Sequence, residues 1–456
     1  MIQTIRNAWA VPELRKKILF TVFVLLVFRL GSAIPVPYID SSALELHLQN
    51  QSGTILGLMN AMSGSAFSMA TIFALSVQPY INSSIIIQLL TVAIPALERL
   101  AKDGGEEGRK KIAAITRYTT VGIGLLQGFG YYSLIKSYNL IETGSMNAIW
   151  VGIVIVLSFT AGSAFMMWLG EQITEFGVGN GISVLLFAGI VSRFPRMVRD
   201  AVSGVSIWSG VQKGTVTVDS LVSAGYTAEQ AQAQVNLALA PWMVPVIVFG
   251  LLALVVFIVF ISNAERRLPV QYAKRVVGRK MYGGQSTHIP MKVNMSGVMP
   301  IIFAQSIASL PATVGAFVGW TTDNSGMMRL FDTSRPFYSI LYFFLIIGFS
   351  YFYATMQFNP IEVSNNLKKN GGFIPGFRPG KPTTDFISKV LSKITMFGAL
   401  YLSVVAIAPI ITGNIFGYRS LAIGGTSVII VVGVALETVK QMEAQMLMRH
   451  YKGFLE

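Results

Sequence analysis

The sequence predicts an all-α polytopic membrane protein with ten transmembrane helices. Of its 456 residues, 53% are hydrophobic and only 12% are charged, whereas soluble domains carry about 25% charged residues. Apolar runs of about 20 residues, the length that crosses a bilayer core, recur along the whole chain. A transmembrane β-barrel would instead show short segments of alternating hydrophobicity.

The predicted spans also predict an orientation. They cover residues 18–34, 72–94, 118–135, 149–169, 182–198, 242–262, 298–320, 340–356, 394–411 and 421–439. An even number of spans places both termini on one side. The segments on that side hold 26 of the 35 Lys and Arg residues, the other loops hold 8, and Arg29 lies inside the first span. Because Lys and Arg favour the cytoplasmic side, we expect both termini in the cytoplasm.

Two long basic loops lie on the side with the termini, at residues 263–297 and 357–393. In the first loop, residues 270–282 mix basic and apolar residues around a glycine, which predicts a short hairpin or a bent hook. In the second, Pro375, Pro379 and Pro382 exclude a regular helix. Such loops suit acidic partners: anionic lipid, ribosomal RNA or an acidic protein groove. Attraction to the membrane surface alone is the alternative.

Residues 54–73 predict a short half-helix apart from the second span. This segment is moderately apolar, contains several Gly and Ser residues, and precedes Pro79, which interrupts helical hydrogen bonding near the start of that span. Non-helical backbone at membrane depth is tolerated only inside protein or beside a cavity. The alternative is an ordinary external amphipathic loop. A second external segment, residues 203–240, contains a helix-like stretch at 228–239 and is interpreted as a capping structure.

Several kinds of chemistry are absent from the sequence. It contains no cysteine and three widely separated histidines, which argues against disulfides and against thiolate or histidine metal sites. It lacks the nucleotide-binding and hydrolase motifs, so we predict neither an enzyme nor a cofactor. The spans contain almost no Asp, Glu or His, which ion-coupled carriers usually keep inside the bundle.

Uncharged polar residues instead lie in two of the spans and their approaches. They are Gln78, Asn82, Ser83, Ser84, Gln88, Thr91, Asn294, Ser296 and Gln305. One interpretation is ordinary hydrogen bonding between helices. The other is a seam between helices that parts when something polar must pass. Three functions remain open from these patterns: a passive channel, a secondary transporter, or a scaffold without a pore.

Several long motifs, in order, resemble the SecY family, whose members form the central subunit of the bacterial protein-translocation channel. These motifs are FRLGSAIPVP (28–37), PYINSSIIIQLLT (79–91), MWLGEQITEFGVGNGIS (167–183), YAKRVVGRKMYGGQSTHIPMKVNMSGVMPIIFA (272–304), FNPIEVSNNLKKNGGFIPGFRPG (358–380) and GGTSVIIVVGV (424–434). The resemblance implies two inverted, pseudo-symmetric halves around a central pore. It also implies a lateral gate formed mainly by spans two and seven.

The same resemblance implies functional residues. An apolar pore ring would consist of Val77, Ile81, Ile182, Leu186, Ile302 and Val405. A plug would consist of Leu56, Gly57, Leu58, Met59, Asn60, Ala61, Met62, Ser63, Gly64, Ser65, Ala66 and Phe67. The lateral gate would include Asn82, Ser83, Gln88, Thr91, Asn294 and Gln305. The motor and ribosome docking residues would be Arg266, Arg267, Lys274, Arg275, Arg279, Lys280, Lys368, Lys369 and Arg378.

The resemblance further implies the partners and the domain organisation. The partners would be the small membrane subunits SecE and SecG, the motor ATPase SecA, the translating ribosome, signal peptides, preproteins and anionic lipids. The chain would divide into an N-terminal half (1–202, with a plug at about 54–68), an external loop (203–240), a C-terminal half (241–440) and a cytoplasmic tail (441–456). Its location would be the bacterial cytoplasmic membrane. Two features depart from the family pattern: the 203–240 loop matches no motif, and valine at position 77 replaces the usual isoleucine.

Overall fold

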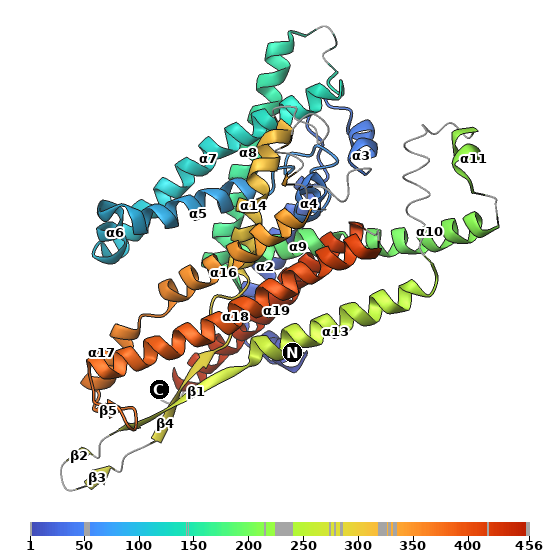
Figure 1. The fold of residues 1–456 in the computed structure, drawn as a ribbon. Helices are drawn as coiled ribbons and strands as arrows, with labels where there is room; N and C mark the ends of the chain where they lie inside the picture. The colour runs from blue at the N-terminus through green and yellow to red at the C-terminus, as the bar shows by residue number, and fades with distance from the viewer. Residues whose placement is uncertain are drawn as a thin grey trace.

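The computed structural model describes residues 2–49, 55–142, 144, 146–213, 216–223, 240–272, 275–277, 280–282, 286–317, 326, 330–331, 335–416 and 419–452. Figure 1 shows long helices lying side by side, with the strands gathered at one end. The helices are α1 (Ile2–Ala10), α2 (Pro12–Gly31), α3 (Ser41–Gln49), α4 (Ile55–Met62), α5 (Gln78–Ala93), α6 (Pro95–Lys102), α7 (Gly105–Ser137), α8 (Ala148–Phe176), α9 (Gly181–Ser192), α10 (Phe194–Gln212), α11 (Val218–Ser223), α13 (Met243–Asn263), α14 (Met299–Phe317), α16 (Pro336–Gln357), α17 (Pro360–Lys369), α18 (Lys381–Phe416) and α19 (Arg419–Lys452). The strands are β1 (Glu265–Tyr272), β2 (Arg275–Val277), β3 (Lys280–Tyr282), β4 (Ser286–Lys292) and β5 (Gly372–Phe373).

Each predicted span overlaps a helix, in chain order α2, α5, α7, α8, α9, α13, α14, α16, α18 and α19. Within the described residues, five helical stretches are long and apolar enough to cross a membrane, and a sixth qualifies if α5 and α6, bent by 105°, count as one span. Long apolar helices and a dominant helical content confirm the predicted class of an all-α membrane protein.

The helices form two sets that pack in the same order. In the N-terminal set, α5 packs on α7, α7 on α8, and α8 on α9; in the C-terminal set, α14 packs on α16, α16 on α18, and α18 on α19. The sets meet where α14 contacts α5 and α7, and where α19 contacts α9. The short helix α4 contacts α9, α14 and α19, so it lies at the junction of the two sets.

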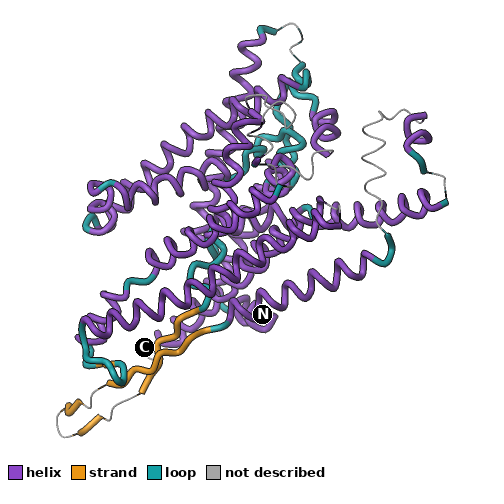
Figure 2. Tube along the Cα trace, viewed as in Figure 1, coloured by secondary structure: helices purple, strands orange, loops and turns teal. Residues whose placement is uncertain are grey.

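The strands confirm the predicted hairpin and extend it. β1 and β4 pair antiparallel from Glu265↔Lys292 to Gln271↔Ser286, and β2 pairs with β3. β5 adds to the other edge of β1, giving the order β4-β1-β5. Figure 2 shows the strands at one extremity of the helical body.

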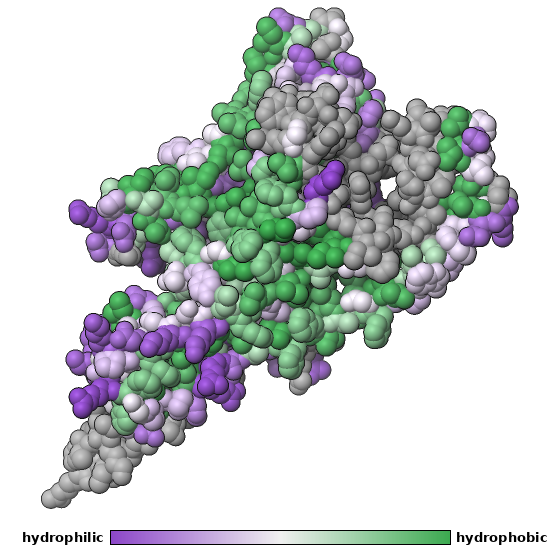
Figure 3. Space-filling view, viewed as in Figure 1, coloured by the Kyte–Doolittle hydropathy of each residue, from purple (hydrophilic) through white to green (hydrophobic). Residues whose placement is uncertain are grey.

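Hydrophobic and hydrophilic residues occupy different parts of the molecular surface. In Figure 3 hydrophobic residues cover the middle of the visible face, and hydrophilic residues collect over α17 and the strands and at the tip near α6. We call the end that carries α6, α17 and β1–β5 the basic end. Residues Val246, Phe249, Leu252, Val256 and Phe260 of α13 are all largely exposed, as expected for a helix that faces lipid.

Both chain termini lie toward one end of the bundle. The first helix, α1, packs against the last, α19, and the Thr4 hydroxyl donates a hydrogen bond to Glu443 Oε1 at 3.0 Å. Ala8, Leu14, Val178 and Met442 form a small buried cluster beside this contact.

Two of the predicted boundaries were wrong. The second span was expected from residue 72, but residues 72–77 form turns and α5 begins at Gln78, with Pro79 in its first turn. Proline suits a first turn because an N–H there would have no helical partner. Likewise Pro382 lies in the first turn of α18 rather than outside a helix. Helix α10 continues to Gln212, into the segment 203–240 that is predicted to be external. The predicted stretch 228–239 lies outside the described residues.

Candidate functional site

The six predicted ring residues come together at the junction of the two sets of helices. Five of them lie in one buried cluster, and Ile182 packs against it. They come from α9, α14, α18 and the beginning of α5, so both sets contribute. The side chains of Val77, Ile81, Leu186, Ile302 and Val405 are at most 3% exposed, and Ile182 is half-buried. In this structure the centre of the molecule is therefore closed by apolar side chains.

The predicted plug is a shorter helix than expected, followed by buried turns. Helix α4 ends at Met62, and residues 63–70 form turns instead of continuing to Phe67. Gly64 has φ +68 and Ser65 has φ +74, and the Ser65 amide donates to the Asn60 carbonyl at 3.0 Å. Left-handed backbone just after the last helical residue is the usual end of a helix. Met59, Met62, Ser63, Ala66 and Phe67 are buried; the side chains of Leu58 and Ala61 lie outside the described part.

The end of this plug helix fits against a glycine of α9. A Cβ atom at Gly189 would lie 2.6 Å from the Met62 carbonyl oxygen, and one at Gly64 would lie 2.7 Å from Ser192 Oγ. Separations below 3.0 Å are not tolerated by real Cβ atoms. The absence of a side chain at Gly189 thus lets α4 approach α9 closely.

A second set of contacts holds the turns after the plug helix. Tyr131 of α7 is fully buried and donates its hydroxyl hydrogen to the Phe67 carbonyl. Its ring stacks on Phe67 with centroids 4.4 Å apart and lies 4.9 Å from the Phe159 ring of α8. These contacts fasten the end of the plug segment to the N-terminal set.

An ion pair lies at the other side of the same turns. Arg196 Nη1 of α10 is 2.8 Å from Glu45 Oε1 of α3 and donates to Ser65 Oγ at 3.5 Å. Helix α3 is itself capped by Asp40, where hydrogen bonds from the Ser42 hydroxyl and the Ala43 and Ser42 amides lower the pKa of the carboxyl group. The plug is therefore in contact with α3, α7, α9, α10 and α14.

Polar residues of α5 and α14 meet at the plug. The Gln78 and Gln305 side-chain amides both donate to Met62 Sδ, at 3.6 and 3.8 Å, and Ser306 Oγ donates to Gln78 Oε1 at 3.5 Å. The Thr313 hydroxyl is 3.9 Å from Met59 Sδ. Of the proposed gate residues, Gln305 lies at this meeting point.

The other proposed gate residues lie elsewhere along the seam. Ser83 Oγ donates to the Thr116 carbonyl of α7, whereas the Gln88 amide donates to Ser84 Oγ and the Thr91 hydroxyl donates to the Ile87 and Gln88 carbonyls within α5. Asn82 is buried. Sequence analysis did not assign Ser306, Thr313, Tyr131 or Gly189 to any site. The spacing of Gln305, Ser306, Ser309 and Thr313 along one face of an otherwise apolar helix was the signal that could have found two of them.

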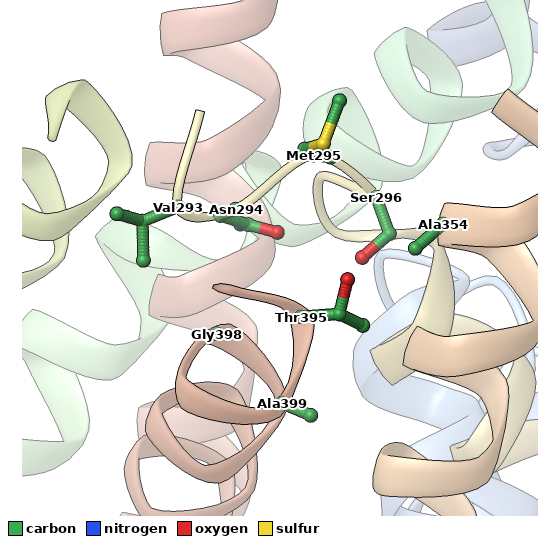
Figure 4. Close-up of a pocket in the computed structure, with 8 residues that line it drawn as sticks. All are labelled: Val293, Asn294, Met295, Ser296, Ala354, Thr395, Gly398 and Ala399. Atoms are coloured by element: carbon green, nitrogen blue, oxygen red, sulfur yellow. The ribbon is translucent and has the colours of Figure 1, made fainter. Parts of the chain in front are cut away.

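Asn294 lies at the joint between the β-hairpin and α14. It lines a small hollow with Val293, Met295, Ser296, Ala354, Thr395, Gly398 and Ala399. In Figure 4 the Ser296 and Thr395 hydroxyls point toward each other, and the Asn294 amide oxygen points toward the same space. Among the described residues, Asn294 Oδ1 has no hydrogen-bond partner. Gly297, with φ +64, then turns the chain into α14.

The two basic loops join into one surface at the basic end. Gln271 and Tyr272 of β1 pair with Phe373 and Gly372 of β5, and the buried side chains of Val270, Leu367, Ile374 and Ile387 pack beneath. Of the proposed docking residues, Arg266, Arg267, Lys368, Lys369 and Arg378 are exposed. Lys274 and Arg279 lie outside the described residues, as do the side chains of Arg275 and Lys280.

These features define a class of protein: a helical membrane protein of two helical sets that meet around a buried short helix, with an exposed basic surface at one end. Comparisons with known proteins narrow this class. The family model described as SecY matches residues 71–439. The protein translocase subunit SecY of Streptomyces scabiei is 42% identical, and that of Bacillus subtilis 40%, each over the full length of both chains.

Solved structures share the fold. One described as "The structure of a protein conducting channel" covers 95% of this chain and 92% of its own at TM-score 0.61 and 15% identity. Another, "Sec61 in the Canine ribosome-channel complex from the endoplasmic reticulum", has the same coverage at TM-score 0.58 and 14% identity. The chain belongs to the SecY family.

Proposed function

We propose that this chain is the pore of a protein translocase: it passes unfolded secretory polypeptides across the membrane and releases apolar segments sideways into lipid. The observation that carries the proposal is the closed apolar cluster, which draws on both sets of helices and includes Met62 and Ala66 of the plug. The names of the full-length relatives support it. We propose no catalytic reaction for this chain.

The proposed residues explain how such a pore works. A narrow apolar ring of Val77, Ile81, Ile182, Leu186, Ile302 and Val405 resists wetting, and thus ion flow, without offering a passing chain a charged partner. The plug at α4 seals the resting state. A parting of α5 from α14 opens the lateral gate, where Asn82, Ser83, Gln88, Thr91, Asn294 and Gln305 lie on or beside the seam. A charged residue opposes release into lipid by about 2.5–3.5 kcal/mol at mid-helix.

We also propose the setting in which the pore acts. The bacterial relatives and the bias in Lys and Arg support a bacterial cytoplasmic membrane with both termini inside. SecE and SecG would be its membrane partners. SecA or the translating ribosome would dock on the basic end, and signal peptides, preproteins and anionic lipids would be its other ligands. The ribosome-bound channels among the structural neighbours support the ribosome as a partner, and the exposed basic residues of α17 and β1 favour the basic end as its docking site.

The proposed pore can be tested by disulfide cross-linking. The chain has no native cysteine, so any disulfide must involve the cysteine that is introduced. In the Ile81→Cys variant we expect a disulfide with a single cysteine placed mid-chain in a stalled secretory polypeptide, because Ile81 lies in the apolar cluster. Phe249→Cys is the control, since Phe249 is 75% exposed on α13. A bond at both positions, or only at the control, would place the route outside the helical bundle and refute the proposal.

The docking surface is tested by charge reversal. Replacing Lys368 and Lys369 together by glutamate is expected to weaken ribosome binding in low salt by about tenfold or more, because two cations at the exposed end of α17 become anions facing a polyanion. The Arg109→Glu, Lys110→Glu double variant makes the same charge change at the start of α7, beside α6 and away in sequence from the two loops that carry the proposed docking residues. Binding measured by co-sedimentation with vesicles should fall far less in that control. Equal losses would indicate general attraction to charge rather than docking at α17.

A further inference from the structure

One methionine of the plug helix is held from both sets of helices at once. Met62 Sδ lies 3.6 Å from Gln78 Nε2 of α5 and 3.8 Å from Gln305 Nε2 of α14. All three side chains are buried, at 3%, 8% and 3% exposure respectively. A single sulfur atom is thus the shared acceptor of two amides that belong to opposite sides of the seam.

One of the two amides, that of Gln78, also joins the two sides directly. Ser306 Oγ of α14 donates to Gln78 Oε1 of α5 at 3.5 Å, so Gln78 contacts both the plug and the opposite helix. If α5 and α14 move apart, the Gln78–Ser306 bond and at least one of the two bonds to Met62 must break. The plug cannot keep both of its amide contacts while the seam is open.

The hydrogen bonds from the two glutamine amides to Met62 Sδ are weak. A thioether sulfur is a poor hydrogen-bond acceptor, and Gln305 Oε1 has no partner among the described residues. Buried amide groups with weak or missing partners raise the free energy of the state that contains them. An extended polypeptide that enters the seam carries free N–H and C=O groups, which are far better partners for both glutamines.

We propose that Met62, Gln78 and Gln305 form a latch that couples the plug to the seam: the latch is closed when one sulfur bridges both glutamines, and the backbone of the passing polypeptide releases it by taking over their amides. The inference rests on the proposed function, since it assigns regulation of that same pore. Coupling of this kind is reciprocal. Parting of α5 from α14 loosens the plug, and loosening the plug favours parting.

The first test is Met62→Leu in the full chain, reconstituted into vesicles with its membrane partners. Leucine keeps nearly the same apolar volume, a change that cores tolerate well, but it removes the acceptor. We expect resting ion conductance, with no polypeptide added, to rise about three- to tenfold, because both amides lose their partner in the closed state. An added Ala66→Cys should then react faster with a membrane-impermeant maleimide.

Met59→Leu is the matched control. Met59 lies three residues earlier on the same helix, and its sulfur faces only the Thr313 hydroxyl, which also donates to the Ser309 carbonyl at 2.8 Å. No amide depends on this sulfur, so its loss leaves no amide unpaired and conductance should stay near the unmodified level. An equal rise in both variants would refute the latch and indicate a packing defect.

A triple variant separates the latch from packing in a second way. Met62→Leu combined with Gln78→Leu and Gln305→Leu replaces every latch partner by an apolar group, which is close to neutral or stabilising for buried pairs. Conductance should return to or below the unmodified level, while polypeptide transport slows. A triple variant that leaks more than Met62→Leu would refute the latch. The proposed pore has its own test, the Ile81→Cys cross-link in the otherwise unmodified chain. A result that refutes the latch therefore does not refute the pore.

Discussion

Replacing Gly189 by alanine is expected to leave the pore open at rest. A Cβ atom there would lie 2.6 Å from the Met62 carbonyl oxygen of α4, and a carbonyl on a helix end cannot turn aside like a flexible side chain. Overpacking of this kind typically costs about 1–3 kcal/mol, which corresponds to about a five- to 140-fold shift toward the displaced plug. Alanine also favours helix over glycine by about 1 kcal/mol, so α9 itself should not weaken.

The measurement is resting ion flux through vesicles that contain the complete complex. Gly122→Ala on α7 is the matched control, because a Cβ atom there would meet nothing within 4 Å. The control gains the same helix preference without a clash and should stay closed. If Gly189→Ala vesicles are as tight as those of Gly122→Ala, then α4 does not seal the pore in the way that its contact with α9 implies.

Replacing Tyr131 by phenylalanine is expected to destabilise the N-terminal set and to loosen the plug segment. The variant keeps the ring that stacks between Phe67 and Phe159, but it removes the donor to the Phe67 carbonyl. A buried carbonyl that loses its donor costs about 1–3 kcal/mol. Because the same bond fastens the turns after α4, the resting flux should rise together with the loss of stability.

Thermal unfolding in detergent and resting flux measure the two effects. Tyr132→Phe is the control, since Tyr132 is the adjacent residue on α7 and packs over Gly152, where a Cβ atom would lie 3.0 Å from its ring. A melting temperature equal to that of the control would show that the Tyr131 hydroxyl contributes nothing to the closed structure. A lower melting temperature with unchanged flux would separate the anchor from the seal.

The sequence was a good guide to features that depend on local pattern. Apolar runs located the helices, and the Gly and basic residues around 278 predicted the hairpin that β1–β4 form. Hydropathy could not place the start of the second span, because residues 63–77 are largely apolar but form turns and, at Thr71, an isolated β-bridge. Their backbone finds partners across the chain instead: the Val36 amide donates to Ala70, and the Ile72 amide donates to Ile34.

The sequence pattern could not predict contacts between residues that lie far apart along the chain. Nothing near Phe373 indicates that it pairs with Gln271, 102 positions earlier. The two methionines of the plug looked like ordinary apolar side chains, and only the fold brings Gln78 and Gln305 to Met62. The residues proposed for the ring came from family resemblance, not from periodicity, and the structure places all six in or against one cluster.

Helix α18 connects the basic end of the molecule to the apolar cluster. It begins at Lys381 in the loop that β5 ties to β1 and continues unbroken past Val405, about 36 Å further along at 1.5 Å per residue. Near its middle, Gly398 fits so closely to the Val293 carbonyl that a Cβ atom would lie 2.4 Å from it. A rigid helix of this length acts as a lever: if it tilts by about 5° about its loop end, Val405 moves sideways by about 3 Å. If a partner docks at the basic end as proposed, a force that it applies there would reach the apolar cluster directly through this helix.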